Sequence, residues 1–100
     1  MPDPSEQLRR LVEAGFQLQT FERFPKAVGV VKGDCIALLE PTAEGLKMVG
    51  TPGWRMGELM GLLVERKGRK VFQAKAQTLD ATPERVEALA RFRAELASFL

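Results

Sequence analysis

Cys35 is the only side chain in this sequence that could act as a thiol nucleophile, and Lys32 lies close to it along the chain. A cysteine becomes reactive when a nearby base or positive charge lowers its pKa. The chain contains no His to serve as that base, so neither a Ser-His-Asp triad nor a Cys-His pair can form within one chain. A Cys/His zinc site is excluded for the same reason. The sequence therefore favours Cys35 as a small buried hydrophobic residue.

Acidic side chains offer a second route to catalysis. Four of them lie near predicted turns and could hold Mg²⁺ or act as an acid–base pair: Asp34, Glu40, Glu44 and Glu58. No spacing among them singles out a pair. A small enzyme using these carboxylates is the weakest of three hypotheses, and the sequence predicts neither a metal nor a cofactor.

The clearest charge pattern is a basic segment over residues 66–75. It contains Arg66, Lys67, Arg69, Lys70 and Lys75, and no acidic residue occurs from 66 to 79, although the net charge of the chain is only +2. With Trp54 and Arg55, these cations could bind single-stranded nucleic acid, the indole stacking on an unpaired base. The alternative is a solvated helix end and strand end. The sequence favours this alternative, because nucleic-acid-binding domains usually carry a larger excess of positive charge.

Glycines around Trp54 suggest close backbone contacts. Residues 50–53, Gly-Thr-Pro-Gly, precede a predicted helix whose N–H groups could attract an anion, but Pro52 removes a donor and no P-loop or Rossmann spacing is present. A plain turn is expected there. Gly57 and Gly61 lie one helical turn apart and would let that helix pack tightly on a sheet. Trp54 is expected to fill the seam between this loop and the core.

Three helices are predicted. The first covers residues 4–14, because Asp3 can cap it, Pro4 suits its first turn and Gly15 can end it. The second begins at Gly57 and ends before Gly68. The third follows the cap residue Thr82 and carries an apolar stripe. The second helix would bury Leu59, Met60, Leu62 and Leu63, and the third would bury Val86, Leu89, Phe92, Leu96, Phe99 and Leu100.

Five strands are predicted between these helices, at residues 17–24, 27–32, 35–40, 46–50 and 69–77. The second and third form a hairpin around Gly33-Asp34, a pair suited to a two-residue turn. The order of elements is αββββαβα. The sequence thus predicts a single α+β domain over residues 1–100, with a five-stranded, mainly antiparallel sheet and helices packed on it.

Both faces of the predicted hairpin are apolar. One face has Val28, Val30, Ala37 and Leu39, and the other has Val31, Ile36 and Leu38. A sheet with one solvated face should alternate apolar and polar residues, so each face here needs a cover. We therefore expect a homodimer. The candidate dimer face is Val28, Val30, Ala37 and Leu39, and the alternative is the set of Val31, Ile36 and Leu38. The competing arrangement places the first and last helices on opposite faces of the sheet.

The remaining sequence features concern the cellular context. No signal peptide or apolar membrane span is evident, so no membrane partner is expected. A single Cys fits a reducing compartment, which favours the cytoplasm. The lack of Asn is in keeping with a thermophilic source. The favoured function is a non-enzymatic binding or self-association module, and the alternative is a nucleic-acid-binding module using the basic segment with Trp54.

Overall fold

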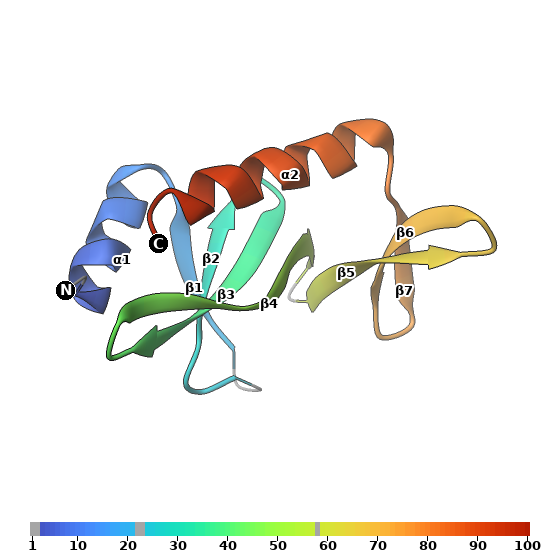
Figure 1. Cartoon of the computed structure of the whole chain (residues 1–100). Helices are drawn as coiled ribbons and strands as arrows, with labels where there is room; N and C mark the ends of the chain where they lie inside the picture. The colour runs from blue at the N-terminus through green and yellow to red at the C-terminus, as the bar shows by residue number, and fades with distance from the viewer. Residues whose placement is uncertain (1–2, 22–23, 58) are drawn as a thin grey trace.

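A computed structural model of the chain describes residues 3–21, 24–57 and 59–100. Within these ranges the chain forms two helices and seven strands (Figure 1). In chain order they are α1 (Pro4–Glu13), β1 (Gln17–Thr20), β2 (Val28–Lys32), β3 (Cys35–Thr42), β4 (Gly45–Met56), β5 (Leu59–Arg66), β6 (Arg69–Ala74), β7 (Gln77–Asp80) and α2 (Pro83–Ala97). The strands form one curled antiparallel sheet in the order β1 to β7. The α+β class is confirmed, whereas the prediction of five strands is wrong.

The capping residues place both helices where the sequence predicts them. In α1, the Asp3 carboxylate accepts a hydrogen bond from the Ser5 N–H at 3.1 Å. The helix ends at Glu13, and Gly15, just after the C-cap residue Ala14, has a φ of +99° that is costly for other residues. In α2, the Thr82 hydroxyl accepts from the Arg85 N–H at 3.3 Å. Local chemistry is thus sufficient to define both helices.

The hairpin of β2 and β3 also forms as predicted. Val28 lies opposite Leu39, and Lys32 lies opposite Cys35 across the turn at Gly33-Asp34. Because side chains alternate along a strand, this register decides which apolar set meets the helices. That set is the one containing Val30, Ala37 and Leu39.

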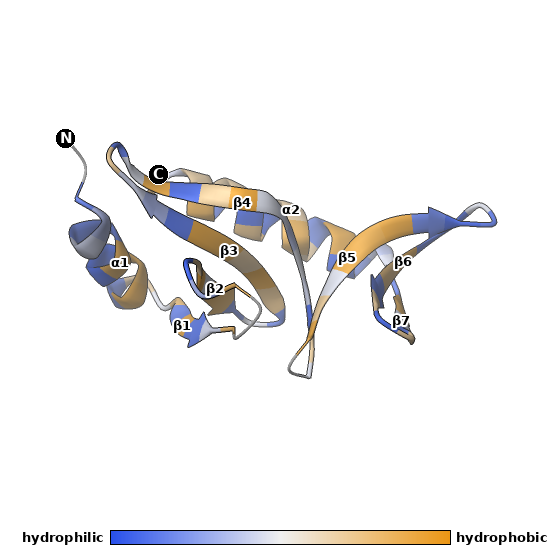
Figure 2. Cartoon of the chain, turned by 90° about the horizontal axis from the view of Figure 1, so that it is seen from below, coloured by the Kyte–Doolittle hydropathy of each residue, from blue (hydrophilic) through white to orange (hydrophobic). Residues whose placement is uncertain are grey.

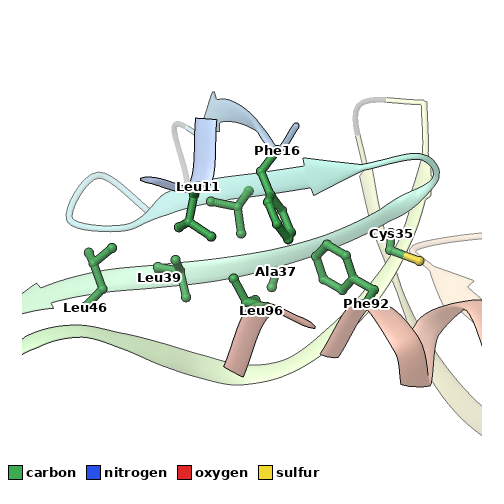
Figure 3. Packing of buried hydrophobic residues seen from close by; sticks show 9 residues of the cluster. Leu11, Phe16, Cys35, Ala37, Leu39, Leu46, Phe92 and Leu96 are labelled. Carbon is green, nitrogen blue, oxygen red and sulfur yellow. The ribbon is translucent and has the colours of Figure 1, made fainter. Parts of the chain in front are cut away.

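Both helices cover the same face of the sheet. Figure 3 shows Leu11 and Phe16 from the α1 side, and Phe92 and Leu96 from α2, packed over β2 and β3. The buried Gln7 side chain ties this layer together, because its amide donates to the Phe99 carbonyl oxygen at 3.0 Å and accepts from the Leu46 N–H at 2.7 Å. The arrangement with helices on opposite faces is therefore wrong.

The predicted second helix is also wrong, since residues 59–66 form strand β5. Its first residues pair with β4, with Gly61 opposite Trp54, and its later residues pair with β6, with Leu63 opposite Phe72. Gly61 lies where neighbouring side chains leave no room for a Cβ. A Cβ at this position would lie 3.3 Å from the Phe72 Cβ and would overlap the Met56 sulfur. Gly57 and Gly61 therefore do not mark a helix face.

Strand β4 continues through the predicted turn at residues 50–53. Leu38 pairs with Val49, but Ile36 pairs with Gly53, so one residue of β3 faces three residues of β4. This bulge contains Gly50, with a φ of +68°, and Pro52, which cannot donate to a ladder. The bulge bends β4 and turns its second half toward β5. The predicted final strand, 69–77, is shorter in the structure: β6 ends at Ala74, and a further strand, β7, follows at Gln77–Asp80.

Candidate functional site

The bend of the sheet creates a groove on its helix-free side. The groove has a volume of about 940 Å³. Leu38 and Val49, a cross-strand pair on the face opposite the helices, form its floor. The residues that line it are Gln19, Thr20, Phe21, Phe24, Leu38, Val49, Gly50, Thr51, Leu59, Met60, Leu62, Ala74 and Lys75. They come from five strands, from the segment that follows β1 and from the β6–β7 turn.

One wall of the groove is aromatic and follows β1. The Phe21 ring lies over Gly29 of β2, where a Cβ would touch it, so the missing side chain of Gly29 makes room for the ring. Two backbone hydrogen bonds hold Phe24 beside it: the Phe24 N–H donates to the Phe21 carbonyl oxygen at 3.1 Å, and the Ala27 N–H donates to the Phe24 carbonyl oxygen at 3.0 Å. Phe24 is left 46% exposed beside the groove.

The opposite wall comes from β5 and the end of β6. Leu59, Met60 and Leu62 contribute apolar surface, and Leu62 is 46% exposed. Lys75 adds a charge at the β6–β7 turn, where its φ is +52°. Among the described lining residues, Lys75 carries the formal charge, and Gln19, Thr20 and Thr51 supply neutral polar groups. The groove is therefore mainly apolar, with a few polar groups.

The hydrophobic sets of the hairpin are placed differently from one another. Three residues of the candidate dimer face, Val30, Ala37 and Leu39, lie in the core beneath the helices, and Val28 is half-buried. The alternate set, Val31, Ile36 and Leu38, is also buried, with exposures of 3%, 0% and 6%. The curled sheet thus shields much of the second face within one chain. The exposed apolar surface on that side lies in the groove walls instead.

The basic segment is divided between two turns. Arg66, Lys67, Arg69 and Lys70 are exposed at the β5–β6 turn, and Figure 2 shows β5 changing from apolar to hydrophilic as it approaches this turn. Lys75 lies at the other end of β6, about 16 Å along the strand from Lys70. The structure therefore groups four of the five cations and places the fifth at the groove.

Trp54 is half-buried and packs apart from this turn. Its indole stacks on Phe72 with ring centroids 5.3 Å apart, and it borders a hollow of about 310 Å³ beneath α2 with Phe92. Trp54 pairs with Gly61, which is about 16 Å along β5 from Arg66. Arg55 is exposed, and its N–H donates to the Asp34 carbonyl oxygen at 2.6 Å. Trp54 is thus not beside the basic turn.

The Cys35 thiol is buried and has lost acidity. Only 4% of the residue is exposed, and burial, with a smaller effect of Asp34, raises the pKa of the thiol to about 11. Lys32 does not serve to activate it, because its ammonium donates to Glu95 and to the Ala14 carbonyl oxygen and lies 4.9 Å from the centre of the Phe16 ring. Cys35 is therefore a core residue.

We expect the native Cys35 thiol to resist modification by a disulfide reagent such as dithionitrobenzoate at neutral pH. A pKa raised by two units lowers the thiolate fraction about a hundredfold, and burial slows access further. Labelling should rise with pH toward about 11 in the folded chain. In concentrated guanidinium chloride, one thiol per chain should react at once. Rapid stoichiometric labelling of the folded chain would contradict this placement.

The candidate carboxylates do not come together. Asp34 lies at the β2–β3 turn, whereas Glu40 is about 20 Å away along β3 and Glu44 is farther still, in the β3–β4 turn. Glu58 lies outside the described residues. Across the described ranges, no group of three or more His, Cys, Asp or Glu side chains is placed to hold a metal ion.

Sequence reasoning missed most of the groove. Phe21, Phe24, Val49 and Met60 were not assigned to any site, because they lie on segments far apart in the chain. The one local signal was Gly29, a small residue on an otherwise bulky apolar face, which marks space for a ring.

Two further findings bear on function. In the part of the chain that is described, neither helix is long and apolar enough to cross a membrane. No protein-family model, no curated protein and no solved structure matches this chain, so its surfaces must carry the functional argument.

Proposed function

We propose that this chain is a non-enzymatic binding module whose groove takes a small, largely apolar ligand. The observation that carries the proposal is the groove itself, with a volume of about 940 Å³ and a mainly apolar lining. Small-molecule sites are typically clefts of about 300 to 1,000 Å³, lined by apolar and aromatic side chains with a few polar groups that orient the ligand. Gln19, Thr51 and Lys75 are suited to that orienting role.

Exposure of large apolar side chains within one hollow supports this proposal. Phe24 and Leu62, on opposite walls, are each 46% exposed. Isolated exposed apolar residues are common on protein surfaces, but apolar residues gathered in a concave site favour an occupant. Covering them would contribute about 25 cal/mol for each Å² of apolar surface removed from water.

A second copy of the chain is the alternative occupant, because we also predict a homodimer from the sequence. A two-fold interface brings the same patch of both copies together. Two concave patches facing each other leave a hollow between them, so the groove shape favours a small ligand over self-association. The oligomeric state in solution distinguishes the two occupants.

A titration with an uncharged fluorescent naphthylamine probe tests the groove. Leu62→Glu places a charge in the groove wall, and we expect it to weaken probe binding at least about tenfold, since a carboxylate cannot lie against an apolar ligand without cost. Leu63→Glu is the matched control, because Leu63 is the next residue of β5, is 38% exposed and does not line the groove. We expect the control to bind within about twofold of the parent chain.

Three results would contradict the proposal. The first is an equal loss of binding in both variants, and the second is no saturable binding in the parent chain. The third is a probe stoichiometry of one per two chains, together with a dimer by analytical ultracentrifugation that Leu62→Glu dissociates. This last result would establish the homodimer instead.

We also propose a cytoplasmic location. Cys35 is the single Cys of the chain and is buried, so the fold is held by packing alone. Proteins of reducing compartments commonly have this character.

A further inference from the structure

The β5–β6 hairpin ends in an exposed basic turn, which we define as residues 66–70. Lys67 and Gly68 have φ values of +51° and +76°, as in the two-residue turns that fit the twist of antiparallel strands. All five residues of the turn are exposed. In Figure 1 this hairpin projects at one end of the molecule, away from α1 and β1.

Two arginines face each other at the base of the basic turn. Arg66 lies directly opposite Arg69 in the antiparallel register. Like charges in such a pair destabilise a sheet. Asp80 forms an ion pair with Arg69 at 3.6 Å, which offsets part of this repulsion. The ion pair is weak, because both side chains are mostly exposed. An anion held between the two guanidinium groups would relieve the repulsion.

The distribution of charge over the chain points to the same partner. Five of the 15 basic residues lie between residues 66 and 79, and all 13 acidic residues lie outside that segment. Four of these five cations lie in the basic turn, where Glu65 is opposite Lys70 and Asp80 is close to Arg69, and the chain outside residues 66–79 has three more acidic than basic residues. Such asymmetry steers an anionic partner toward the turn.

We propose that the basic turn binds the phosphate backbone of double-stranded DNA without sequence preference. Arginine presents a planar fork that binds phosphate oxygens through two hydrogen bonds. A two-stranded β-ribbon has a width that the major groove of B-form DNA admits. Arg66 and Arg69, with Lys67 and Lys70 beside them, could then reach phosphates at the groove edge.

Other anionic partners fit the turn less well. Single-stranded nucleic acid is usually held by stacked aromatic rings, but Trp54 stacks on Phe72 rather than beside the turn. A membrane is usually bound with apolar side chains inserted, and residues 66–70 contain none. Double-stranded RNA has a major groove too narrow for a ribbon. The proposal concerns a surface separate from the groove and does not depend on it.

Fluorescence anisotropy with a short labelled DNA duplex tests the proposal on the full chain. Three to four phosphate contacts predict that affinity falls about 40- to 150-fold between about 50 mM and about 200 mM NaCl. Arg66→Gln combined with Arg69→Gln should lower the affinity at least about tenfold at the lower salt and flatten the salt dependence. Removal of the facing charges should leave the thermal midpoint of this variant unchanged or higher.

The control removes the same charge elsewhere, through Arg91→Gln with Arg93→Gln, two exposed residues of α2, and should bind within about twofold of the parent chain. Equal losses in both double variants would show a general charge effect and overturn the site. An absence of binding at low salt would also overturn the proposal. So would tighter binding to single-stranded DNA, to double-stranded RNA or to vesicles containing phosphatidylserine.

Discussion

Gly53→Ala is expected to destabilise this protein by about 3 kcal/mol or more, although overpacking substitutions in general cost about 1 to 3 kcal/mol. The Cβ of an alanine at position 53 would overlap the carbonyl oxygen of Gly61 on the neighbouring strand. A backbone oxygen cannot rotate away as a side chain can. Relief therefore requires β4 and β5 to separate at the point where the sheet curls.

Urea unfolding monitored by tryptophan fluorescence and by far-ultraviolet circular dichroism measures this effect. The chain has one Trp and no Tyr, so the fluorescence reports on Trp54, the residue next to the substitution. Gly61→Ala is the matched control, because its Cβ would overlap the flexible end of the Met56 side chain instead of backbone. We expect a smaller loss there, and we expect Met56→Ala to relieve it. Equal stability of Gly53→Ala and the parent chain would show that the two strands do not approach this closely.

Phe16→Ala is expected to lower the free energy of unfolding by about 3 to 5 kcal/mol, the usual range for a buried phenylalanine. Phe16 is 2% exposed, and its ring centroid lies 5.8 Å from that of Phe92 and 6.0 Å from that of Phe99. The Lys32 ammonium also lies over this ring. Removal of the ring therefore opens a cavity where β2 and both helical segments meet. A domain of this size is stable by only about 5 to 15 kcal/mol, so the loss is a large fraction of the total.

Phe24→Ala makes the same chemical change on the groove wall and serves as the comparison for Phe16→Ala. Phe24 is 46% exposed, so its removal should cost less than about 1 kcal/mol of stability while weakening binding of the naphthylamine probe. Thermal or urea unfolding should thus show the larger stability loss in Phe16→Ala, whereas the probe titration should show a loss of binding in Phe24→Ala. A large stability loss in Phe24→Ala, or none in Phe16→Ala, would contradict the assignment of core and groove.

Elements with local signals could be predicted from the sequence. The β2–β3 register follows from Gly33-Asp34, a pair that sets a two-residue turn whatever lies elsewhere in the chain. The bounds of α1 and α2 follow from Asp3, Gly15 and Thr82, whose capping contacts are made within a few residues. For these elements, the information needed is contained in short stretches of sequence.

Strand β5 could not be predicted in this way. The spacing of a helical stripe is matched by Leu59, Met60, Leu62 and Leu63. Adjacent leucines also suit a strand with apolar contacts on both faces, as in β5, where Leu62 lines the groove and Leu63 lies opposite Phe72. Pairing with β4 and β6 decides between them, and that pairing is a tertiary interaction. The groove depends on the same pairing, because its walls meet only when the sheet curls. The cations of the basic segment were identified from composition, but their grouping at a turn depended on β5 being a strand.

The order of strands has a consequence for the way this chain folds. Each strand pairs with the strand that precedes it in the sequence, so the sheet can grow by adding one hairpin after another, with small loop-closure entropy at each step. The contact between the two ends of the chain is not local in this way, because the Gln7 side chain of α1 bonds to the Phe99 carbonyl oxygen across nearly the whole sequence. The strands β5 to β7 take no part in the cluster that this contact completes. We therefore expect these strands to open locally as a unit, with their amides exchanging with solvent while the cluster beneath α1 and α2 stays closed.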